Sequence, residues 1–482
     1  MARALMLQGT GSDVGKTVLV AGLCRVAKLR GLKVAPFKPQ NMSTNAAVAD
    51  DGGEIGRAQW LQALAAGMPP SVHMNPVLLK PQTETGAQII VHGKVQGRAE
   101  GRDYQGLKAG LLDAVLRSYR HLRESADLVL VEGAGSPAEI NLRAGDIANM
   151  GFACAADVPV VLVGDIHRGG VIASLVGTHT ILPEADAGMI IGYLINKFRG
   201  DVSLFDDGLA AITDFTGWHS FGVVPWLRAA NRLPPEDSPG FMQPAAHATR
   251  KLRIVVPVLP HMANFDDLDP LYAEPDVELV LLKDGQAFPP ATDVVILTGS
   301  KATIADMRML EKSGRADELR HYAAKGGRVI GICGGYQMLG KRIYDPQRIE
   351  GDAAEITGLG LLDVETVMRP EKIVRNVRGY ASGEPVSGYE IHLGETHGAD
   401  CARAPVMIEN RPDGAASADG CVWGCYLHGL FNAGRFRQKF LHNLGRESDG
   451  RNHQEKIEEA LNDIASELEK VLDIDALFAA AR

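Results

Sequence analysis

The sequence predicts an α/β protein with two doubly wound parallel-sheet domains, followed by a C-terminal helical segment. Short apolar runs rich in β-branched residues, such as 158–163 and 293–297, alternate with helical patterns in both halves of the chain. A stretch rich in Pro, Gly and small residues separates the halves. We therefore expect domains at 1–232 and 251–440, a linker at 233–250 and a helical tail at 441–482.

Composition narrows the class of protein. The chain of 482 residues is long enough for two or three cores, and its 45% hydrophobic and 23% charged residues are ordinary for a globular protein. The formal net charge of −9 argues against nucleic acid or an anionic membrane as the main partner. Six cysteines without the spacing of a disulfide framework or a zinc site favour a cytoplasmic location.

The first chemical motif is a glycine loop. An apolar strand at 4–7 runs into the sequence GTGSDVGKT at 9–17, and a helix is expected from about 18 to 30. In such a loop, backbone amides hold phosphates, Lys16 reaches the terminal phosphates and the Thr17 hydroxyl binds Mg²⁺. The candidate nucleotide-binding residues are Gly9, Thr10, Gly11, Ser12, Gly15, Lys16 and Thr17.

Five polar residues near predicted strand ends are further candidates in the first half. Glu132 ends the strand at 127–131, where a second Mg²⁺ carboxylate is expected beside a phosphate loop. Lys38 follows another strand and faces phosphate or an acceptor carboxylate, unless it is a solvated loop lysine. Asp50 could help hold Mg²⁺ or belong to a solvated acidic turn. Asp146 positions an acceptor or caps a helix, and Asn196 contacts a nucleotide base or ends a turn.

The second half is organised around Cys333. The apolar strand at 329–332 runs into this cysteine, and Gly334 and Gly335 then open a helix. A cysteine at such a turn lies at a helix N-terminus, where backbone amides stabilise a thiolate and can bind an oxyanion. We interpret Cys333 as a nucleophile, the alternative being a buried structural cysteine.

A thiol nucleophile needs a base, and His428 lies between glycines after another short apolar run. The two stretches resemble the class I, triad-type glutamine amidotransferases, in which the cysteine releases ammonia from glutamine and the histidine is its base. That family usually has a Glu two residues after the histidine, where this chain has Leu430. The cobyrinic acid-amidating branch is similar in lacking this carboxylate, so what orients His428 stays open.

The same resemblance implies further roles. Gly299 and Ser300 match the loop that completes the oxyanion hole opposite Gly334 in the amidotransferases. The Gly-Tyr-Glu-Ile-His run at 388–392 resembles a signature of the cobyrinic branch, so Tyr389 and Glu390 hold glutamine or stiffen the His428 loop, unless they form an edge strand. The first half resembles the dethiobiotin synthetase group, which implies ATP and Mg²⁺, with Glu132 in the metal site.

Taken over its whole length, the chain resembles the cobyric acid synthase family. The resemblance implies ATP- and glutamine-dependent amidation, through acyl phosphates, of the b, d, e and g carboxylates of adenosylcobyrinic acid a,c-diamide in cobalamin biosynthesis. Two alternatives are a cobyrinic acid a,c-diamide synthase and a non-catalytic nucleotide-binding switch with a degenerate amidotransferase domain. The expected partners are glutamine and a corrinoid carboxylate. The C-terminal helix is expected to pack internally or to form a homo-oligomer contact.

Overall fold

The computed structural model describes residues 2–81, 86–235, 251–350 and 354–482, and only the backbone of residues 98–109. The chain divides into two compact units. Unit 1 comprises residues 1–43, 49–236 and 457–482, and unit 2 comprises residues 44–48 and 237–456. Most of the predicted linker, residues 236–250, lies outside the described residues.

Unit 1 is built on a six-stranded sheet in which every neighbouring pair of strands is parallel. The strand order is β12-β11-β10-β1-β9-β2, so the chain begins in the interior of the sheet. The strands are β1 (Arg3–Gly9), β2 (Val34–Phe37), β9 (Leu128–Glu132), β10 (Val160–Asp165), β11 (Ile190–Phe198) and β12 (His219–Pro225).

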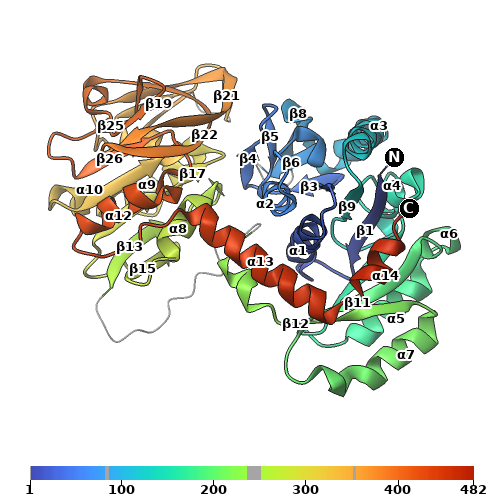
Figure 1. The fold of residues 1–482 in the computed structure, drawn as a ribbon. Coiled ribbons are helices and arrows are strands. Elements are labelled where there is room, and N and C mark those ends of the chain that lie inside the picture. Colours follow the sequence, from blue (N-terminus) through green and yellow to red (C-terminus); the bar gives the residue numbers. More distant parts are fainter. Residues whose placement is uncertain (1, 82–85, 236–250, 351–353) are drawn as a thin grey trace. The chain divides into compact units, whose positions relative to one another are not determined.

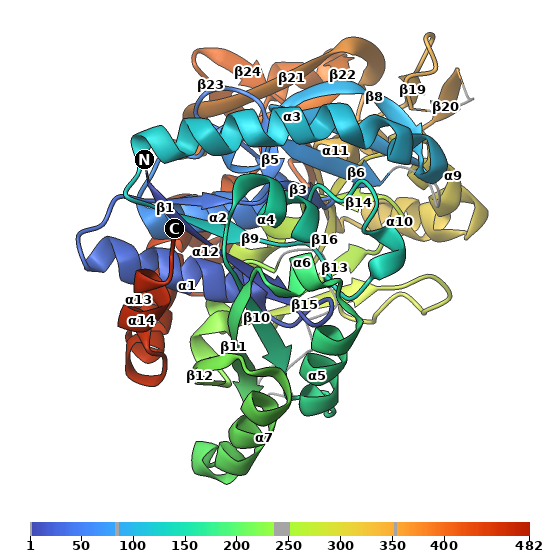
Figure 2. The same cartoon turned by 90° about the vertical axis from the view of Figure 1, so that its right-hand side faces the viewer.

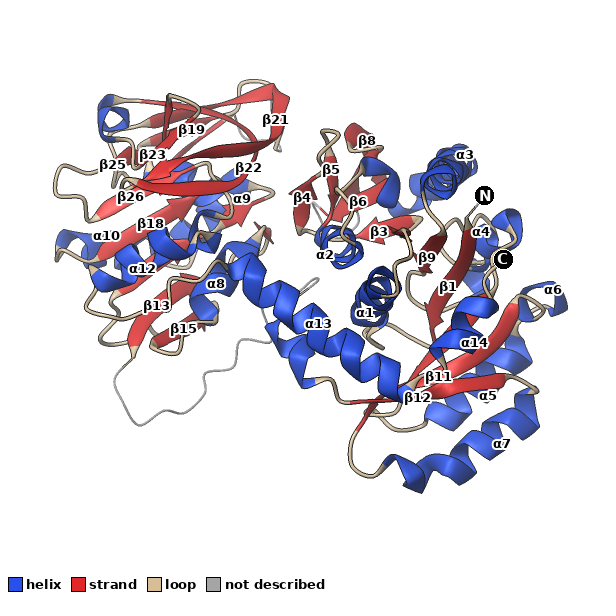
Figure 3. Ribbon diagram, in the orientation of Figure 1, coloured by secondary structure: helices blue, strands red, loops and turns tan. Residues whose placement is uncertain are grey.

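The sheet buries both of its faces, because side chains alternate along each strand. In β1, Leu5 and Leu7 belong to one hydrophobic cluster, while Ala4 and Met6 belong to another on the opposite face. Helices cover both faces (Figure 3). They are α1 (Lys16–Leu29), α2 (Arg57–Ala66), α3 (Gly101–Ser125), α4 (Met150–Ala156), α5 (Val171–Ile181), α6 (Glu184–Ala187) and α7 (Asp206–Thr216).

The end of the chain completes unit 1. Helices α13 (His453–Val471) and α14 (Ile474–Ala479) lie beside α1 (Figure 1), and a second view shows the same neighbourhood (Figure 2). From Ile457 onward their apolar side chains join the cluster under α1. A Cβ added to Gly22 of α1 would lie 2.5 Å from Leu468 Cδ1, so glycine permits this close packing. The part of the predicted helical tail from Ile457 onward thus belongs to the core of unit 1, whereas residues 441–456 belong to unit 2.

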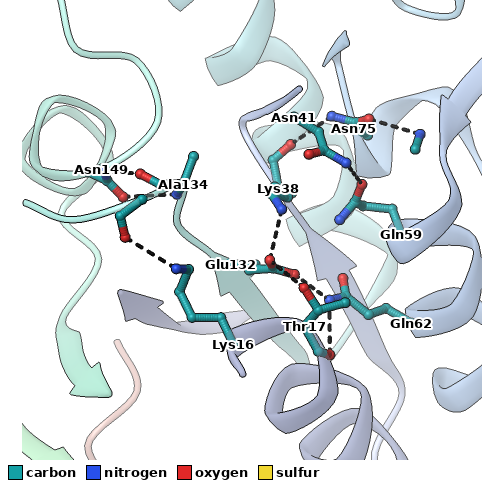
Figure 4. Close-up of polar contacts among 12 residues, drawn as sticks. Lys16, Thr17, Lys38, Asn41, Gln59, Gln62, Asn75, Glu132, Ala134 and Asn149 are labelled. Carbon is teal, nitrogen blue, oxygen red and sulfur yellow. Dashed lines mark hydrogen bonds and ion pairs between the residues drawn. The ribbon is translucent and has the colours of Figure 1, made fainter. Parts of the chain in front are cut away.

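A small four-stranded sheet is inserted after β2. Its order is β3-β6-β7-β8, with a parallel β3–β6 pair and two antiparallel pairs. The strands are β3 (Gln40–Met42), β6 (Val77–Pro81), β7 (Gly86–Val91) and β8 (Lys94–Glu100). The insertion begins just after Lys38, and Asn75, which precedes β6, donates to Lys38 O at 3.3 Å (Figure 4).

Unit 2 contains a second parallel sheet, in the order β15-β13-β16-β18-β26-β25, with only the β25–β26 pair antiparallel. Its strands are β13 (Leu252–Pro257), β15 (Val277–Leu282), β16 (Val294–Leu297), β18 (Arg328–Ile332), β25 (Ala415–Ala416) and β26 (Val422–Cys425). Its helices are α8 (Asp269–Tyr272), α9 (Thr303–Lys312), α10 (Arg315–Ala324), α11 (Gly334–Leu339) and α12 (Gly434–His442).

A second, largely antiparallel sheet belongs to the same unit and is dominated by a long hairpin (Figure 3). The hairpin strands are β21 (Glu365–Ala381) and β22 (Glu384–His397), with β19 (Arg342–Tyr344), β20 (Glu355–Thr357), β23 (Val406–Ile408) and β24 (Arg411–Asp413) beside them. A short pair joins β14 (Met262–Ala263) to β17 (Gly299–Ser300). Tyr389 and Glu390 therefore lie in β22, which pairs with β21 on one side and meets His428 through an isolated bridge at Tyr389, in line with the edge-strand alternative. Among the described residues, no helix is both long and apolar enough to cross a membrane.

Candidate active sites

The phosphate loop follows β1 and leads directly into α1. Thr10 continues the strand through a backbone N–H that donates to Val163 O at 3.0 Å. Gly15 precedes the helix with φ 96°, in the left-handed region that favours glycine. The buried Lys16 ammonium donates to the carbonyl oxygens of Gly11 at 3.3 Å and Gly135 at 3.1 Å. The side chain thus lies across the loop, where phosphate oxygens are expected.

Glu132 is the centre of a buried polar cluster at the carboxyl edge of the sheet (Figure 4). Its Oε1 accepts from Thr17 Oγ1 at 2.9 Å and from Lys38 Nζ at 2.8 Å, and its Oε2 accepts from Gln62 Nε2 at 2.5 Å. Strand register explains the meeting: Phe37 is paired with Val131, so the next residues, Lys38 and Glu132, emerge side by side.

The chemistry of this cluster fits Mg²⁺. The Thr17 hydroxyl and the Glu132 carboxylate are the hard oxygen ligands that Mg²⁺ prefers, and Mg²⁺ usually keeps several waters. The fully buried Gln62 supplies another oxygen, because its Oε1 has no hydrogen-bond partner among the described residues. An unpartnered buried acceptor beside Glu132 suits a water bound to such an ion.

Asp146 and Asn196 are tied to backbone in this structure. Asp146 Oδ1 accepts from the N–H of Ala148 at 2.8 Å and of Asn149 at 3.0 Å, and Oδ2 accepts from Gly151 N at 2.8 Å. This is the helix-capping alternative for Asp146. Asn196 Nδ2 donates to Val14 O at 2.8 Å, so its amide supports the phosphate loop. Catalytic and base-binding roles for the two residues stay predictions.

Asp50 lies on an exposed turn, whereas Glu132 is buried at the strand end. Its two acidic neighbours are engaged elsewhere: Asp51 accepts from Ser71 Oγ at 2.6 Å, and Glu54 forms a buried ion pair with Lys80. Within the described residues, no group of three or more His, Cys, Asp or Glu side chains could hold a metal ion. The structure favours the acidic-turn interpretation of Asp50, and a metal role stays a prediction.

In unit 2, Cys333 occupies a strained turn between β18 and α11. Its φ of 53° and ψ of −110° are unusual for a residue with a side chain. The two glycines that follow are sterically required: a Cβ on Gly335 would lie 2.0 Å from Leu297 O, and one on Gly334 would lie 2.8 Å from Ser300 N. Such a strand–turn–helix is the backbone form of a nucleophile elbow.

The predicted oxyanion residues converge at this turn. The backbone nitrogen of Ser300 lies close to Gly334, because a Cβ on Gly334 would come within 2.8 Å of it. A Cβ on Gly299 would lie 3.3 Å from His428 Cε1, so this loop also adjoins the histidine. The Ser300 hydroxyl donates to Asp306 Oδ2 at 2.6 Å, which fixes this loop. The backbone of Ser300 therefore lies against the turn that carries Cys333, and an oxyanion-binding role for Ser300 and Gly334 stays a prediction.

His428 reaches Cys333 because their strands are adjacent. Ile332 of β18 is paired in parallel with Cys425 of β26, and Cys333 N donates to Cys425 O at 2.9 Å. The residues that follow both strands thus emerge at the same sheet edge. The imidazole is 1% exposed. The structure brings together the two residues that the sequence assigned as nucleophile and base.

The orientation of His428, left open by the sequence, comes from Asp267. Asp267 lies in a short 3₁₀ helix, Phe265–Leu268, and its Oδ2 is 2.7 Å from His428 Nδ1. Since a carboxylate can only accept, Nδ1 carries the hydrogen and Nε2 is left for the thiol. Burial lowers the pKa of His428, but the negative charges of Asp267 and Cys333 and hydrogen bonds to both outweigh it, so the pKa is raised above its ordinary value.

Tyr389 and Glu390 differ in what they contact. The Tyr389 ring stacks on His428 with centroids 5.1 Å apart, and the two residues exchange backbone hydrogen bonds. Glu390 is fully buried, and its oxygens bind Arg375 at 2.6 Å and Arg411 at 2.7 Å. Burial opposes ionisation of Glu390, yet the nearby His392 and hydrogen bonds from the two arginines lower its pKa to about 2. Tyr389 is thus placed to stiffen the His428 loop, and Glu390 is occupied by arginines.

Fold and sites together define a class: a phosphate-loop nucleotide-binding domain joined to a glutamine amidotransferase domain. Residues 5–239 match the family described as CobQ/CobB/MinD/ParA nucleotide binding domain, and residues 253–436 match the CobB/CobQ-like glutamine amidotransferase domain. These matches confirm the predicted α/β class of both halves. They also make the first half a nucleotide-binding domain.

The chain belongs to the cobyric acid synthase family. It is 64% identical to the cobyric acid synthases of Brucella suis and Brucella canis and 63% identical to that of Brucella melitensis, with 100% of both chains covered in each comparison. Similarity to solved structures is low, for example 18% identity and a TM-score of 0.31 with PurLQS from Thermotoga maritima, over 44% of this chain and 98% of that one. The family assignment therefore rests on the relatives.

Two contacts of these sites were missed by sequence reasoning. Asp267 lies 161 residues before His428, and no spacing signal links the two. Gln62 lies in α2, where it reads as an ordinary helical residue. One signal was present for Asp267: it belongs to a cluster of three acidic residues at 266, 267 and 269 that directly follows the Phe265 region and is buried. Buried carboxylates need a partner, but only the fold identifies it.

Proposed function

We propose that this protein is a cobyric acid synthase, which amidates the b, d, e and g carboxylates of adenosylcobyrinic acid a,c-diamide with glutamine as the nitrogen donor and ATP as the activator. The observation that carries the proposal is full-length similarity to cobyric acid synthases, together with intact residues at both sites. The corrinoid and the four positions come from the relatives' names and the family resemblance.

In the glutaminase half-reaction, the Cys333 sulfur attacks the carboxamide carbon of glutamine. The amides of Ser300 and Gly334 stabilise the oxyanion, and His428 Nε2 returns a proton to the departing ammonia. Water then hydrolyses the glutamyl thioester, with His428 as its base. The strained backbone at Cys333 fixes the position of the sulfur. The surrounding fold supports this strain before the reaction begins.

In the synthetase half-reaction, Lys16 and the loop amides bind the ATP phosphates, and the acceptor carboxylate takes the γ-phosphoryl group. Lys38, next to Glu132, is placed to neutralise charge on the acceptor or on the transferred group. Ammonia then attacks the acyl carbon and releases inorganic phosphate. Exclusion of water is needed, because an acyl phosphate hydrolyses readily.

Thr17 and Glu132 would hold Mg²⁺, which when bound would supply charge neutralisation for the phosphates. Glu132 already accepts hydrogen bonds from Thr17, Lys38 and Gln62, so an ion bound there would share the carboxylate with these donors. A cytoplasmic location and a homo-oligomer stay predictions.

The test is product analysis with purified protein. Glutamate release and corrinoid mass are followed with Mg-ATP and either a,c-diamide or cobyrinic acid as acceptor. We expect four added amides on the a,c-diamide. The Cys333→Ser variant should lose glutamine-dependent amidation but keep it with ammonium chloride, whereas Lys16→Ala should lose amidation with either nitrogen donor.

Other outcomes identify the alternatives. Amidation of cobyrinic acid at two positions only would indicate an a,c-diamide synthase. Absence of both glutamate release and amidation would support a non-catalytic nucleotide-binding switch. The hydrogen-bonded His428 and its contact with Cys333 count against that switch, because a degenerate domain has no need to maintain them.

A further inference from the structure

The carboxylate beside the candidate base comes from an unexpected part of unit 2. Asp267 follows β14, whereas the position two residues after the histidine is Leu430, which is 1% exposed and belongs to the hydrophobic core. Asp267 has both oxygens engaged: Oδ2 with His428 Nδ1 at 2.7 Å and Oδ1 with Gly429 N at 2.6 Å. One carboxylate thus binds the ring and the backbone of the next residue.

We propose that Asp267 is the positioning residue of the base, holding His428 in the tautomer and orientation that directs Nε2 to Cys333, a role that rests on the glutaminase reaction proposed above. In class I amidotransferases the carboxylate that orients the histidine follows it in the sequence. In this chain the carboxylate comes from Asp267, which lies before β15. Its two oxygens bind His428 and Gly429, so Asp267 acts on the reaction through His428.

The surroundings of Asp267 are rigid in the way a positioning residue requires. Asn264 adopts a left-handed conformation, φ 53°, and its Nδ2 donates to Ala46 O at 2.7 Å and to Tyr389 Oη at 2.9 Å. Tyr389 Oη in turn donates to Asp266 at 3.4 Å, while its ring covers His428. The 3₁₀ helix, β22 and the His428 loop are therefore cross-linked by buried hydrogen bonds.

The electrostatics agree with this geometry. The ionisable groups around His428 are Asp267 from the 3₁₀ helix, Cys333 from the elbow and Tyr389 from β22, and Cys425 of β26 lies close to both Asp267 and Cys333. Burial raises the pKa of the Cys425 thiol well above its ordinary value, so this second cysteine stays neutral. Asp267 is then the carboxylate that stabilises an imidazolium next to a thiolate.

The experiment compares Asp267→Asn and Asp267→Glu with Asp345→Asn. Asp345 is a matched control, since it is also fully buried in unit 2 and accepts backbone N–H groups, those of Ile349 and Glu350, each at 2.8 Å. Asparagine at 267 presents an NH₂ group to either His428 or Gly429, both of which are donors. We expect glutaminase kcat to fall by about 10²- to 10⁴-fold in Asp267→Asn with KM changed less than threefold. Asp345→Asn should keep kcat within threefold.

A second readout separates positioning from simple stability. The rate of Cys333 alkylation by iodoacetamide is measured against pH in each variant. Loss of the Asp267 charge favours neutral His428, so Asp267→Asn should shift this profile, and alkylation at pH 7 should slow by tenfold or more. Asp267→Glu retains the charge and should keep the wild-type alkylation profile even where its longer side chain lowers kcat. Ammonium-dependent amidation should be unchanged in all variants, which also reports folding.

The outcomes are distinct. Equal kcat and equal alkylation profiles for wild type and Asp267→Asn would overturn the role of Asp267. The role would also be overturned if Asp267→Asn had a lower kcat but the same alkylation profile as wild type. The loss of activity would then reflect a structural effect and not a change in the charge state of His428. If Asp267→Asn fails to fold, Asp267→Glu provides the test. Cys333 alkylation at pH 7 that is tenfold slower in Asp267→Glu than in wild type would then refute the role of Asp267, because this variant keeps the negative charge. Lack of glutaminase in the wild type would instead refute the proposed function.

Discussion

Removal of Arg437 from its buried ion pair with Glu274 is predicted to destabilise unit 2 strongly. Arg437 is 0% exposed, and it donates to Glu274 Oε1 at 2.6 Å, to Phe431 O at 2.7 Å and to Arg451 O at 2.7 Å. Replacing it by methionine keeps much of the aliphatic volume but leaves a buried carboxylate whose remaining donor, among the described residues, is Ser448 Oγ at 2.9 Å. Breaking a buried pair in this way costs about 3–5 kcal/mol.

The size of the effect can be checked against an exposed pair. Lys341 and Asp363 form an ion pair whose side chains are 53% and 54% exposed, and such pairs contribute about 0–1 kcal/mol. For a unit of this size, 1 kcal/mol corresponds to roughly 2–4 °C, so Arg437→Met should lower the melting temperature of unit 2 by roughly 6–20 °C. Lys341→Met should lower it by less than roughly 4 °C.

The assay is differential scanning calorimetry of the full chain, with thermal loss of glutaminase activity used to assign the transition of unit 2. An Arg437→Met shift no larger than that of Lys341→Met would refute the reasoning. It would mean that Glu274 is protonated or reaches water once the arginine is absent.

Three further outcomes are expected. Gly15→Ala should weaken ATP binding by about tenfold or more in titration calorimetry, because Gly15 has φ 96° and a Cβ would lie 2.4 Å from Asn196 Nδ2. Gly22→Val should destabilise unit 1 by roughly 1–3 kcal/mol through overlap with Leu468, so ATP-dependent amidation should be lost at a lower temperature while glutaminase persists. Burial raises the pKa of Asp413 to about 6, so the folded state binds this proton more tightly than the unfolded state. Wild-type stability should therefore gain, relative to Asp413→Asn, by roughly 1–2 kcal/mol as pH falls from 8 to 5 in denaturant titrations; an unchanged difference would contradict the shift.

The sequence alone determined the fold class and the local motifs. The glycine loop before Lys16 and the Cys333 elbow are specified by consecutive residues, since each depends on glycines at fixed positions within a strand–turn–helix. Periodicity fixed the parallel strands, because a strand buried on both faces must be continuously apolar. Full-length resemblance to the cobyric acid synthases was likewise readable from motifs, and the relatives confirm it.

Tertiary structure alone decided which side chains meet. The register of β2 on β9 puts Lys38 against Glu132, and the fold brings Gln62 from α2 to the same carboxylate. Asp267 reaches His428 only because the turn after β14 lies over the end of β26, a neighbourhood that no local pattern encodes. Pairing between distant residues depends on strand order and register, and these are set by the packing of whole sheets.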